Sequence, residues 1–293
     1  MLQTIAVTGG NGKLGKAVLA ELDNKNYETV NVARGKRREE LSDSYIRTDL
    51  LDAGNVYGAL VESNADAVVH AGTIPGPGRN PGYEVYESNV MSTYHILEAA
   101  SALNLESVCI ASSINAMGAA YQDDPIDVRY LPVDEKHPVT PRDPYAISKH
   151  SLEVTCDGFG RQDTAPKTIS TIRYPWIATS EELRTNFKSA DRSLEKIGSE
   201  AMGGPNELFT YIHIDDAARV TRKALEANFV GHERFWAVAS DTTLDSSSDI
   251  VAGRYYPDAE LRESLSEHQS LVDIDKARKL LDWAPNHTWR EVD

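Results

Sequence analysis

The chain has 293 residues and a net charge of −15, from 45 acidic and 30 basic residues. Such an acidic chain is a poor partner for nucleic acid, whose backbone rewards basic patches. It has no apolar run near 18 residues and no signal-peptide pattern, so we expect no membrane contact and a cytoplasmic location. Two cysteines, Cys109 and Cys156, fit a reducing compartment without a disulfide framework.

The first predicted element is a buried parallel strand at 2–8, and a helix over 13–22 follows it. Three glycines between them have a G-x-x-G-x-x-G spacing, which allows a tight turn and a close approach of the backbone to a pyrophosphate. The free N–H groups that begin the helix favour phosphates. We predict a dinucleotide site here, with a ligand-free glycine turn as the alternative. Its residues are Gly9, Gly12, Lys13, Leu14 and Gly15.

Further strands and helices alternate along the first half of the chain. The predicted strands are 29–33, 45–48, 67–70 and 107–112, and the helices are 55–62, 86–103 and 145–159. This alternation argues for a parallel sheet that helices cover on both faces. We therefore predict an α/β fold with a doubly wound Rossmann sheet.

The end of the second strand usually selects between the two nicotinamide dinucleotides. A carboxylate there would bind a ribose 2′-hydroxyl, whereas an arginine accommodates a 2′-phosphate. Arg34 lies at this point and no carboxylate does, so we predict NADP, with NAD possible and a solvated basic loop as the alternative. Asp49 and Leu50 follow the third strand and are expected at the adenine, although Asp49 could instead cap the next helix.

Tyr145 and Lys149 are four residues apart on a predicted helix, and Pro144 suits its first turn. A free phenol has a pKa of about 10, but a nearby ammonium lowers it. This pair predicts a general base that takes a carbinol proton while hydride leaves to the cofactor. Ser112 or Ser113, after the fifth strand, could donate a hydrogen bond to the reacting oxygen.

Taken together, these motifs resemble the extended short-chain dehydrogenase/reductases, in the branch of sugar epimerases, dehydratases and sugar dehydrogenases. The resemblance extends over nearly the whole chain, including 211–217 and 276–285. It implies that Ser113, rather than Ser112, is catalytic together with Tyr145 and Lys149. It also implies further cofactor contacts at His70, Ala71, Gly72, Asn89 and Tyr174.

Within this family the chain most resembles uronate dehydrogenases and related enzymes that oxidise C1 of an aldose to a lactone. Ile114 and Asn115 replace an asparagine and a histidine of those enzymes, and Pro75 stands where they have a serine. Arg184 matches the spacing of an arginine that grips a substrate carboxylate, and an ordinary surface arginine is the alternative. The implied substrate site comprises Pro75, Ser113, Asn115, Tyr145 and Arg184.

The predicted Rossmann domain spans 1–174, with 207–232 returning to it. A small substrate lobe takes 175–206 and 235–293, which favours a compact sugar over a nucleotide-sugar. Only 12 of the 30 basic residues are lysines, a feature typical of proteins from a high-salt cytoplasm, although a merely acidic cytosolic enzyme would also fit.

Three functions follow from these features. The first is an NADP-dependent dehydrogenase that oxidises C1 of a neutral aldose, a uronate or a sugar phosphate. The second is a nucleotide-sugar 4-epimerase or dehydratase with tightly bound NAD, and the third is a non-catalytic cofactor sensor. The histidines show no metal-binding spacing, so we expect no metal. By analogy with the family we expect a homo-oligomer, a dimer or tetramer.

Overall fold

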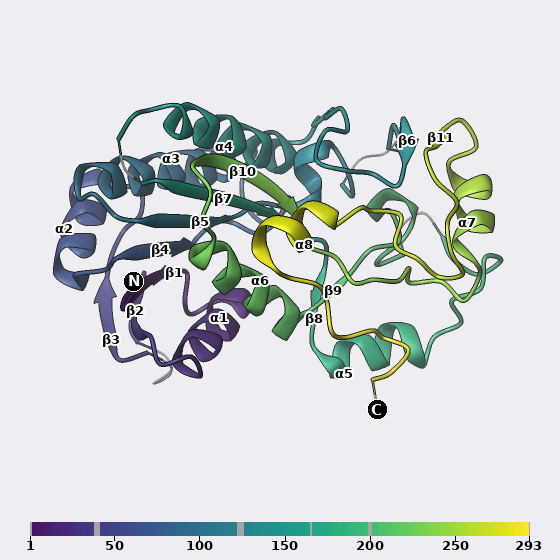
Figure 1. The fold of residues 1–293 in the computed structure, drawn as a ribbon, viewed down its shortest axis with the longest axis horizontal. Helices are drawn as coiled ribbons and strands as arrows, with labels where there is room; N and C mark the ends of the chain where they lie inside the picture. The colour runs from purple at the N-terminus through teal and green to yellow at the C-terminus, as the bar shows by residue number, and fades with distance from the viewer. Residues whose placement is uncertain (1, 38–41, 122–125, 165, 199–200, 293) are drawn as a thin grey trace.

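The structure, a computed structural model, describes residues 2–37, 42–121, 126–164, 166–198 and 201–292. Seven parallel strands form one sheet in the order β10-β7-β5-β4-β1-β2-β3 (Figure 1). Their bounds are β1 Thr4–Thr8, β2 Glu28–Ala33, β3 Ser44–Arg47, β4 Ala67–His70, β5 Ser107–Ala111, β7 Thr168–Arg173 and β10 Gly231–Trp236. The predicted doubly wound Rossmann sheet is confirmed.

Helices cover both faces of this sheet (Figure 1). On one face α3 packs between α2 and α4, and on the other α1 packs against α6. Their bounds are α1 Lys13–Asp23, α2 Ala53–Ser63, α3 Gly82–Ala102, α4 Pro144–Gly160 and α6 Ile214–Glu226. The helix predicted to begin at residue 86 thus begins one turn earlier, directly after Pro81, its N-cap.

The core lies on both faces of the sheet because successive strand residues point to opposite sides. In β1, Ile5 and Val7 join the cluster under α1 and α6, whereas Ala6 joins the cluster under α2, α3 and α4. All three are fully buried. Burying one large aliphatic side chain contributes roughly 1.5–3 kcal/mol, so the strands are held rigidly from both sides.

The C-terminal lobe lies against the carboxyl ends of the strands (Figure 1). It contains two short parallel strand pairs, β8 with β9 and β6 with β11. Phe187 centres its core and meets Trp176, Tyr211 and Trp289 edge-on at 5.4–6.0 Å between ring centroids. The bounds are β6 Tyr130–Leu131, β8 Ile177–Ala178, α5 Ser180–Leu183, β9 Ile212–His213, α7 Ser248–Tyr255, β11 Glu260–Leu261 and α8 Asp275–Leu281.

Three segments cross the predicted domain boundaries. Strand β6, within the predicted Rossmann segment 1–174, pairs with β11 in the lobe. The sheet continues beyond the predicted segment 207–232, because β10 runs to Trp236. Helix α8 packs on α6 and β10, so part of 235–293 lies against the sheet rather than in the lobe. None of the helices in the described ranges is long and apolar enough to cross a membrane.

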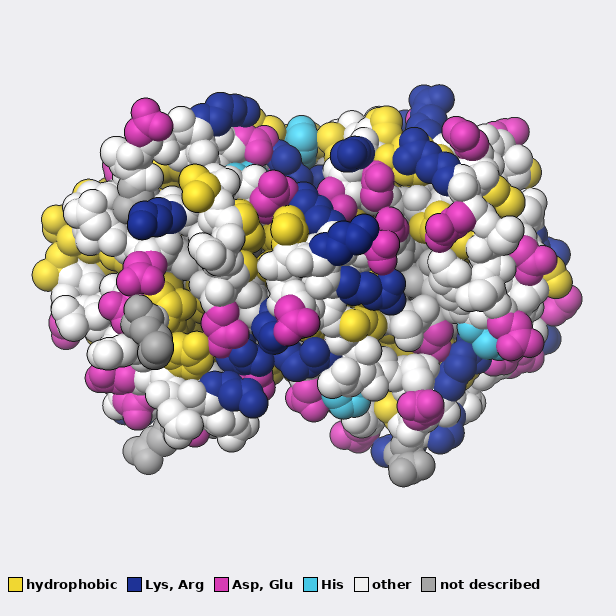
Figure 2. All heavy atoms as spheres, in the orientation of Figure 1, with side chains coloured by type: hydrophobic (Ala, Val, Ile, Leu, Met, Phe, Trp, Pro, Cys, Tyr) yellow, Lys and Arg dark blue, Asp and Glu magenta, His cyan; other side chains and the backbone are white. Residues whose placement is uncertain are grey.

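Charged side chains of both signs lie on the viewed face of the molecule. Figure 2 shows several Lys and Arg side chains near the middle of the viewed face, where acidic side chains lie among them. In the same orientation, Figure 1 places the junction of the sheet and the lobe there. On this face, basic side chains therefore occur near the junction although the chain is net negative.

Candidate active site

The β1–α1 loop has the backbone that its glycines predict. Gly9 has a φ of +72°, and a Cβ there would lie 2.7 Å from the backbone of Ala71. A Cβ on Gly15 would lie 2.3 Å from the Gly9 carbonyl oxygen. Gly12 is the N-cap of α1 and makes no side-chain capping bond. This helix start suits a diphosphate because its first N–H groups have no intrahelical partners.

The Lys13 side chain points to the lobe and not along the glycine loop. Its Nζ donates to the Ile177 carbonyl oxygen at 2.7 Å and pairs with Glu182. Both charged side chains are about 40% exposed, so this pair adds little stability. The side chain therefore already has partners, and Lys13 reaches a phosphate most directly through its backbone N–H, as the helix start predicts.

The loop after β2 presents Arg34 to solvent, together with Arg37. The Tyr45 hydroxyl donates to the Ala33 carbonyl oxygen at 2.9 Å, which ties the end of β2 to β3. Arg38, the last residue of the basic stretch, lies outside the described residues. An exposed guanidinium at this strand end is available to a 2′-phosphate, so the preference for NADP stays a prediction.

Of the two roles expected for Asp49, a contact with the adenine or capping of the next helix, the capping role is wrong. The cap of α2 is Asp52, which accepts from the Asn55 N–H at 2.8 Å. Asp49 is exposed and accepts from the Leu51 N–H at 3.1 Å. The buried Leu50 side chain meets Gly72, where a Cβ would lie 2.5 Å from it. Asp49 therefore does not cap α2, and its contact with the adenine stays a prediction.

His70 is structural and neutral. Its Nδ1 lies 2.7 Å from Thr8 Oγ1, and its Nε2 lies 3.1 Å from Ser92 Oγ. Burial, and then the charge of Lys149, lower its pKa to about 3. The Thr8 hydroxyl also accepts from the Gly72 N–H at 3.2 Å. These bonds fix the ends of β1 and β4, including 70–72, beside the glycine loop.

Asn89 connects three elements from within α3. Its Oδ1 accepts from the Ile74 N–H at 2.8 Å, and its Nδ2 donates to Ser148 Oγ at 3.0 Å. The Ser148 hydroxyl donates to the Tyr145 carbonyl oxygen at 2.7 Å. Asn89 is fully buried, so it holds the loop after β4 against the helix that carries Tyr145.

The three predicted catalytic residues lie together at the carboxyl edge of the sheet. Tyr145 hydrogen-bonds Ser113 through the side chains. Lys149 Nζ lies 5.6 Å from the centroid of the Tyr145 ring and donates to the Ala111 carbonyl oxygen at 2.7 Å. Asp143 caps α4 by accepting from the Tyr145 N–H at 2.9 Å. This cap, with Pro144 in the first turn, sets Tyr145 rigidly at the helix start.

The expected lowering of the phenol pKa is wrong for the ligand-free chain. Burial raises the pKa of Tyr145, and the hydrogen bond with Ser113 only partly opposes it. Burial also lowers the pKa of Lys149 to about 7, against the pull of Glu153. Both groups are nearly inaccessible to water, and removal from water favours their neutral forms.

The predicted substrate residues divide into two groups. Asn115 is buried, and its Nδ2 and N–H both donate to Ser113 Oγ at 3.1–3.2 Å. Within the described ranges, Asn115 Oδ1 has no hydrogen-bond partner. Pro75 and Arg184 are exposed, Arg184 at the start of a π-helical turn over Arg184–Lys188. The structure thus places Asn115 at the catalytic group and Arg184 in the lobe.

Tyr121 lies at the site although no sequence motif indicated it. Its ring meets the Tyr145 ring edge-on at 6.1 Å between centroids, and a Cβ on Gly76 would lie 3.3 Å from its hydroxyl. The side chain is 54% exposed. Its position in a loop that follows a strand end was the available signal, because such loops cover ligand sites in parallel sheets.

The side chain of Tyr174 lies away from the catalytic group. Its hydroxyl lies 2.7 Å from Thr221 Oγ1 of α6, and burial raises its pKa well above the ordinary value. Its carbonyl oxygen accepts from the Ile114 N–H at 2.9 Å. The phenol is therefore satisfied inside the core, and the predicted cofactor contact at Tyr174, which would use its backbone, stays a prediction.

One cluster of possible metal ligands, which no sequence spacing indicated, lies outside this group. Ligand atoms of His213, Asp215 and His287 lie within 4.8 Å of one another. The two rings stack at 4.1 Å and 22°, so their in-plane lone pairs run side by side and do not converge. His213 Nε2 also hydrogen-bonds Ser180 at 3.0 Å. We assign no metal to this cluster.

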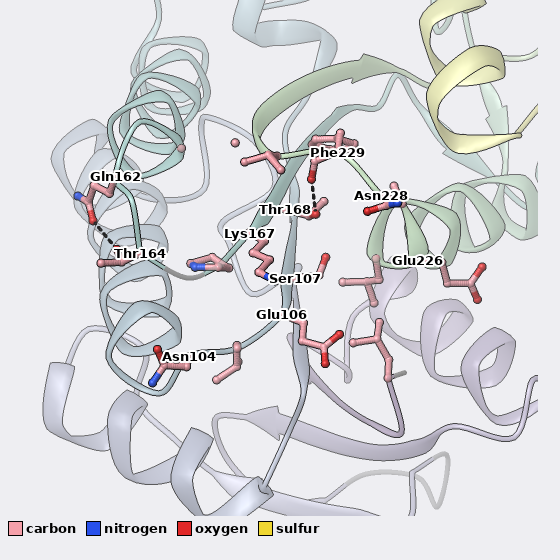
Figure 3. Close-up of a pocket in the computed structure, with 18 of the residues that line it drawn as sticks. Asn104, Glu106, Ser107, Gln162, Thr164, Lys167, Thr168, Glu226, Asn228 and Phe229 are labelled. Carbon is pink, nitrogen blue, oxygen red and sulfur yellow. Dashed lines mark hydrogen bonds between the residues drawn. The ribbon is translucent and has the colours of Figure 1, made fainter.

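A cavity of about 1120 Å³ opens at the opposite edge of the sheet. Figure 3 shows its lining from the starts of β5 and β7 and from the turn before β10, with Thr168 donating to the Phe229 carbonyl oxygen at 2.7 Å. Ser107 begins β5, whereas Ser113 follows the end of that strand. The cavity is therefore separate from the catalytic group.

A parallel sheet with a glycine loop after β1 and a Ser-Tyr-Lys group beyond β5 defines the class of Rossmann-type dehydrogenases and related enzymes. The chain belongs to the NAD dependent epimerase/dehydratase family, which residues 5–239 match. The predicted family is confirmed, and its members include NAD-dependent enzymes that modify sugars.

Several known proteins are similar to this chain. A UDP-glucose 4-epimerase of Rhizobium leguminosarum is 23% identical over an alignment covering 99% of this chain and 95% of that protein. A mutated uronate dehydrogenase has a similar structure, with a TM-score of 0.67, 20% identity and coverage of 99% and 85%. MoeE5 in complex with UDP-glucuronic acid and NAD gives a TM-score of 0.71, 19% identity and coverage of 99% and 96%.

Proposed function

We propose that this protein is an NADP-dependent, cytoplasmic dehydrogenase that oxidises C1 of an aldose to the lactone. The observation that carries this proposal is the meeting of Ser113, Tyr145 and Lys149 at the carboxyl edge of the sheet, the edge at which β1 also leads into the glycine loop. A buried phenol, a hydroxyl and an ammonium group at one point suit removal of a proton from a carbinol.

Three residues of the chain have separate roles in this oxidation. Ser113 donates a hydrogen bond to the C1 oxygen of the sugar, and Tyr145 takes the proton of that hydroxyl group. Lys149, held by the Ala111 carbonyl oxygen and by Thr73 Oγ1 at 3.1 Å, favours the phenolate when it carries its proton. The C1–H bond breaks as the C1–O bond becomes a carbonyl, so the sugar loses one proton and one hydride.

The dinucleotide, when bound, supplies the acceptor for that hydride. The uncapped start of α1 suits its diphosphate, and exposed Arg34 suits a 2′-phosphate. The positive charge of an oxidised nicotinamide would also oppose the effect of burial on Tyr145, because it favours the phenolate. Cofactor binding would then prepare the base for catalysis.

The substrate we propose is a compact sugar. Asn115 Oδ1, which lacks a partner among the described residues, can accept from a sugar hydroxyl next to C1. Arg184 would hold a carboxylate or phosphate if the sugar carries one. A neutral aldose, a uronate and a sugar phosphate all fit, and the uronate dehydrogenase of similar fold supports this class.

A second candidate is a nucleotide-sugar 4-epimerase or dehydratase that retains NAD. The similarity to a UDP-glucose 4-epimerase over 99% of the chain favours it. Such an enzyme would use the same three residues and reoxidise its own cofactor in each turnover. Arg34 favours the first candidate, because a retained NAD has no 2′-phosphate to bind.

One experiment separates these candidates. The purified protein is incubated with a panel of aldoses, uronates and sugar phosphates and with NADP or NAD at molar salt, while the absorbance of reduced nicotinamide is followed. The proposal expects one sugar to reduce added NADP stoichiometrically. No reduction by any sugar, together with copurifying NAD, would favour the epimerase.

We also propose that two copies of the chain pair through α3 and α4. These helices pack side by side on one face of the sheet, and they carry large exposed apolar side chains. Those side chains are Tyr83, Tyr86, Met91 and Tyr94 of α3 and Ile147 and Val154 of α4. Burial of this face in a dimer would remove them from water.

A further inference from the structure

One face of α4 connects to the end of β5 at three successive turns. Tyr145, Lys149 and Glu153 follow each other at i, i+4 and i+8, so they lie on the same face of the helix. Tyr145 hydrogen-bonds Ser113, and Lys149 Nζ donates to the carbonyl oxygen of Ala111, two residues before Ser113. The third of these residues, Glu153, has no place in the mechanism above.

Glu153 hydrogen-bonds Ser112, the residue between Ala111 and Ser113. The Ser112 hydroxyl donates to Glu153 Oε1 at 2.7 Å, and both side chains are buried. Ser112 directly precedes Ser113, so this bond fixes the backbone from which the catalytic hydroxyl projects. The strand end is then tied to α4 at every residue from 111 to 113.

Glu153 is a buried carboxylate with arginine partners. Arg173 donates to both of its oxygens, at 3.0 and 2.7 Å, and Arg234 donates at 3.1 Å. Burial alone would raise the pKa of Glu153, but the charge and hydrogen bonds of Arg173 lower it. The group is therefore ionised and brings a negative charge one turn from Lys149.

The other groups around Lys149 do not supply a counter-charge. Its Nζ donates to Thr73 Oγ1 and to the Ala111 carbonyl oxygen, Tyr145 is a phenol of raised pKa, and His70 is neutral. Among the described residues that face Lys149, Glu153 alone is a carboxylate that favours its charged form.

We propose that Glu153 is a positioning residue for the oxidation, which orients Ser113 through Ser112 and keeps Lys149 protonated in its buried site. This inference rests on the proposed function, since it assigns how the same catalytic group is maintained. Glu153 contacts neither the sugar nor the reacting atoms and acts only through its neighbours.

Asp157 offers a matched control one turn further along α4. It pairs with Arg234 and lies 2.8 Å from His232 Nδ1, so it belongs to the same ion-pair network. Within the described part of the chain, its hydrogen bonds and ion pairs go to His232 and Arg234, and none goes to Ser112 or Lys149. A merely structural network would respond similarly to loss of either carboxylate.

Two variants separate the two parts of the proposal. Glu153→Gln keeps an oxygen for Ser112 and removes the charge, so the alkaline limb of kcat/KM should move down by roughly one pH unit as Lys149 loses its proton earlier. Ser112→Ala keeps the charge and should lower kcat about tenfold at every pH, as expected when a positioning contact is lost. Asp157→Asn should do neither.

A second measurement does not need a substrate. In protein labelled with ¹³C-lysine, the ε-CH₂ signal that disappears in Lys149→Met reports the titration of Lys149. Its midpoint should fall by roughly one pH unit in Glu153→Gln and stay unchanged in Ser112→Ala and Asp157→Asn. An unchanged Lys149 midpoint in folded Glu153→Gln would overturn the proposal. If Glu153→Gln does not fold, a wild-type kcat in Ser112→Ala would overturn it instead.

If no sugar is oxidised by the wild-type protein, the proposed function fails while this titration still tests the link between Glu153 and Lys149. If a sugar is oxidised and the midpoint does not move, the function stands and the role of Glu153 is wrong. The two failures are therefore distinguishable.

Discussion

Replacing Gly15 with alanine should weaken dinucleotide binding strongly, although the substitution adds only one methyl group. The new Cβ would lie 2.3 Å from the Gly9 carbonyl oxygen and 2.7 Å from Gly10 Cα, whereas ordinary contacts begin at 3.4 Å. The turn would have to move by about 1 Å, and overpacking of this kind costs about 1–3 kcal/mol. We expect the Kd for NADP to rise by about 5- to 150-fold, because 1.4 kcal/mol is a factor of ten.

Gly58→Ala is the control for this prediction. Gly58 lies within α2, and a Cβ there would meet nothing within 4 Å. Alanine should therefore stabilise the protein by about 0.5–1 kcal/mol and leave NADP binding unchanged. Isothermal titration calorimetry and urea unfolding measure both effects. Wild-type NADP affinity in Gly15→Ala would refute the assignment of this loop to the dinucleotide.

Four further predictions follow from the site and the surface. Tyr145→Phe should lower kcat by about 10²–10⁴-fold and leave the NADP Kd unchanged; an equal loss of binding in calorimetry would argue against its role as the base. Arg34→Ala should raise the KM for NADP up to about fivefold, as expected for loss of about 1 kcal/mol from an exposed charge pair, and a matching rise for NAD would remove its assignment to a 2′-phosphate. The folded pKa of Lys149, about 7, lies below its unfolded value of about 10.4, so unfolded chains bind more protons between these values and stability should rise with pH in that window. In urea unfolding, the free energy of unfolding of Lys149→Met should rise relative to that of the wild type as pH falls from 10 to 7, by at most about 1.4 kcal/mol per pH unit. A difference between the two proteins that stays constant with pH would contradict this. Val154→Arg, in the apolar face of α4, should give monomers in light scattering, and an unchanged assembly would exclude pairing through that face.

The arrangement of the sheet could be predicted because its signals are local. Each strand is a short apolar run, and a helix with its own periodicity follows most of them. The first turn of α3 was missed because Gly82 and Pro81 are usually loop residues. Pro81 instead stands as the N-cap, where its lack of an N–H has no cost.

The catalytic group was also predictable from short spacings. Tyr145 and Lys149 are one helical turn apart, and Ser113 follows a strand whose carboxyl end borders the ligand site. The ionisation of the group was not predictable, since it depends on how much water reaches each side chain. Spacing shows an ammonium near a phenol and does not show that both are buried.

The contacts that the sequence did not indicate join distant parts of the chain. Lys13 pairs with Glu182 and Tyr174 with Thr221, and no local pattern indicates either partner. Glu153 meets both its arginines only after β7 and β10 have joined the sheet. Such contacts follow from tertiary packing, which one sequence without homologues does not specify.

Transfer of deuterium from the sugar tests the central claim most directly. The sugar found in the substrate panel is labelled at C1 with deuterium and oxidised by the wild-type protein, and the reduced dinucleotide is analysed by mass spectrometry. We predict one deuterium per reduced NADP, with a rate of transfer about 10²–10⁴-fold lower in Tyr145→Phe. Reduced NADP that carries no deuterium, with the label still on the sugar, would contradict oxidation at C1 by this Ser-Tyr-Lys group.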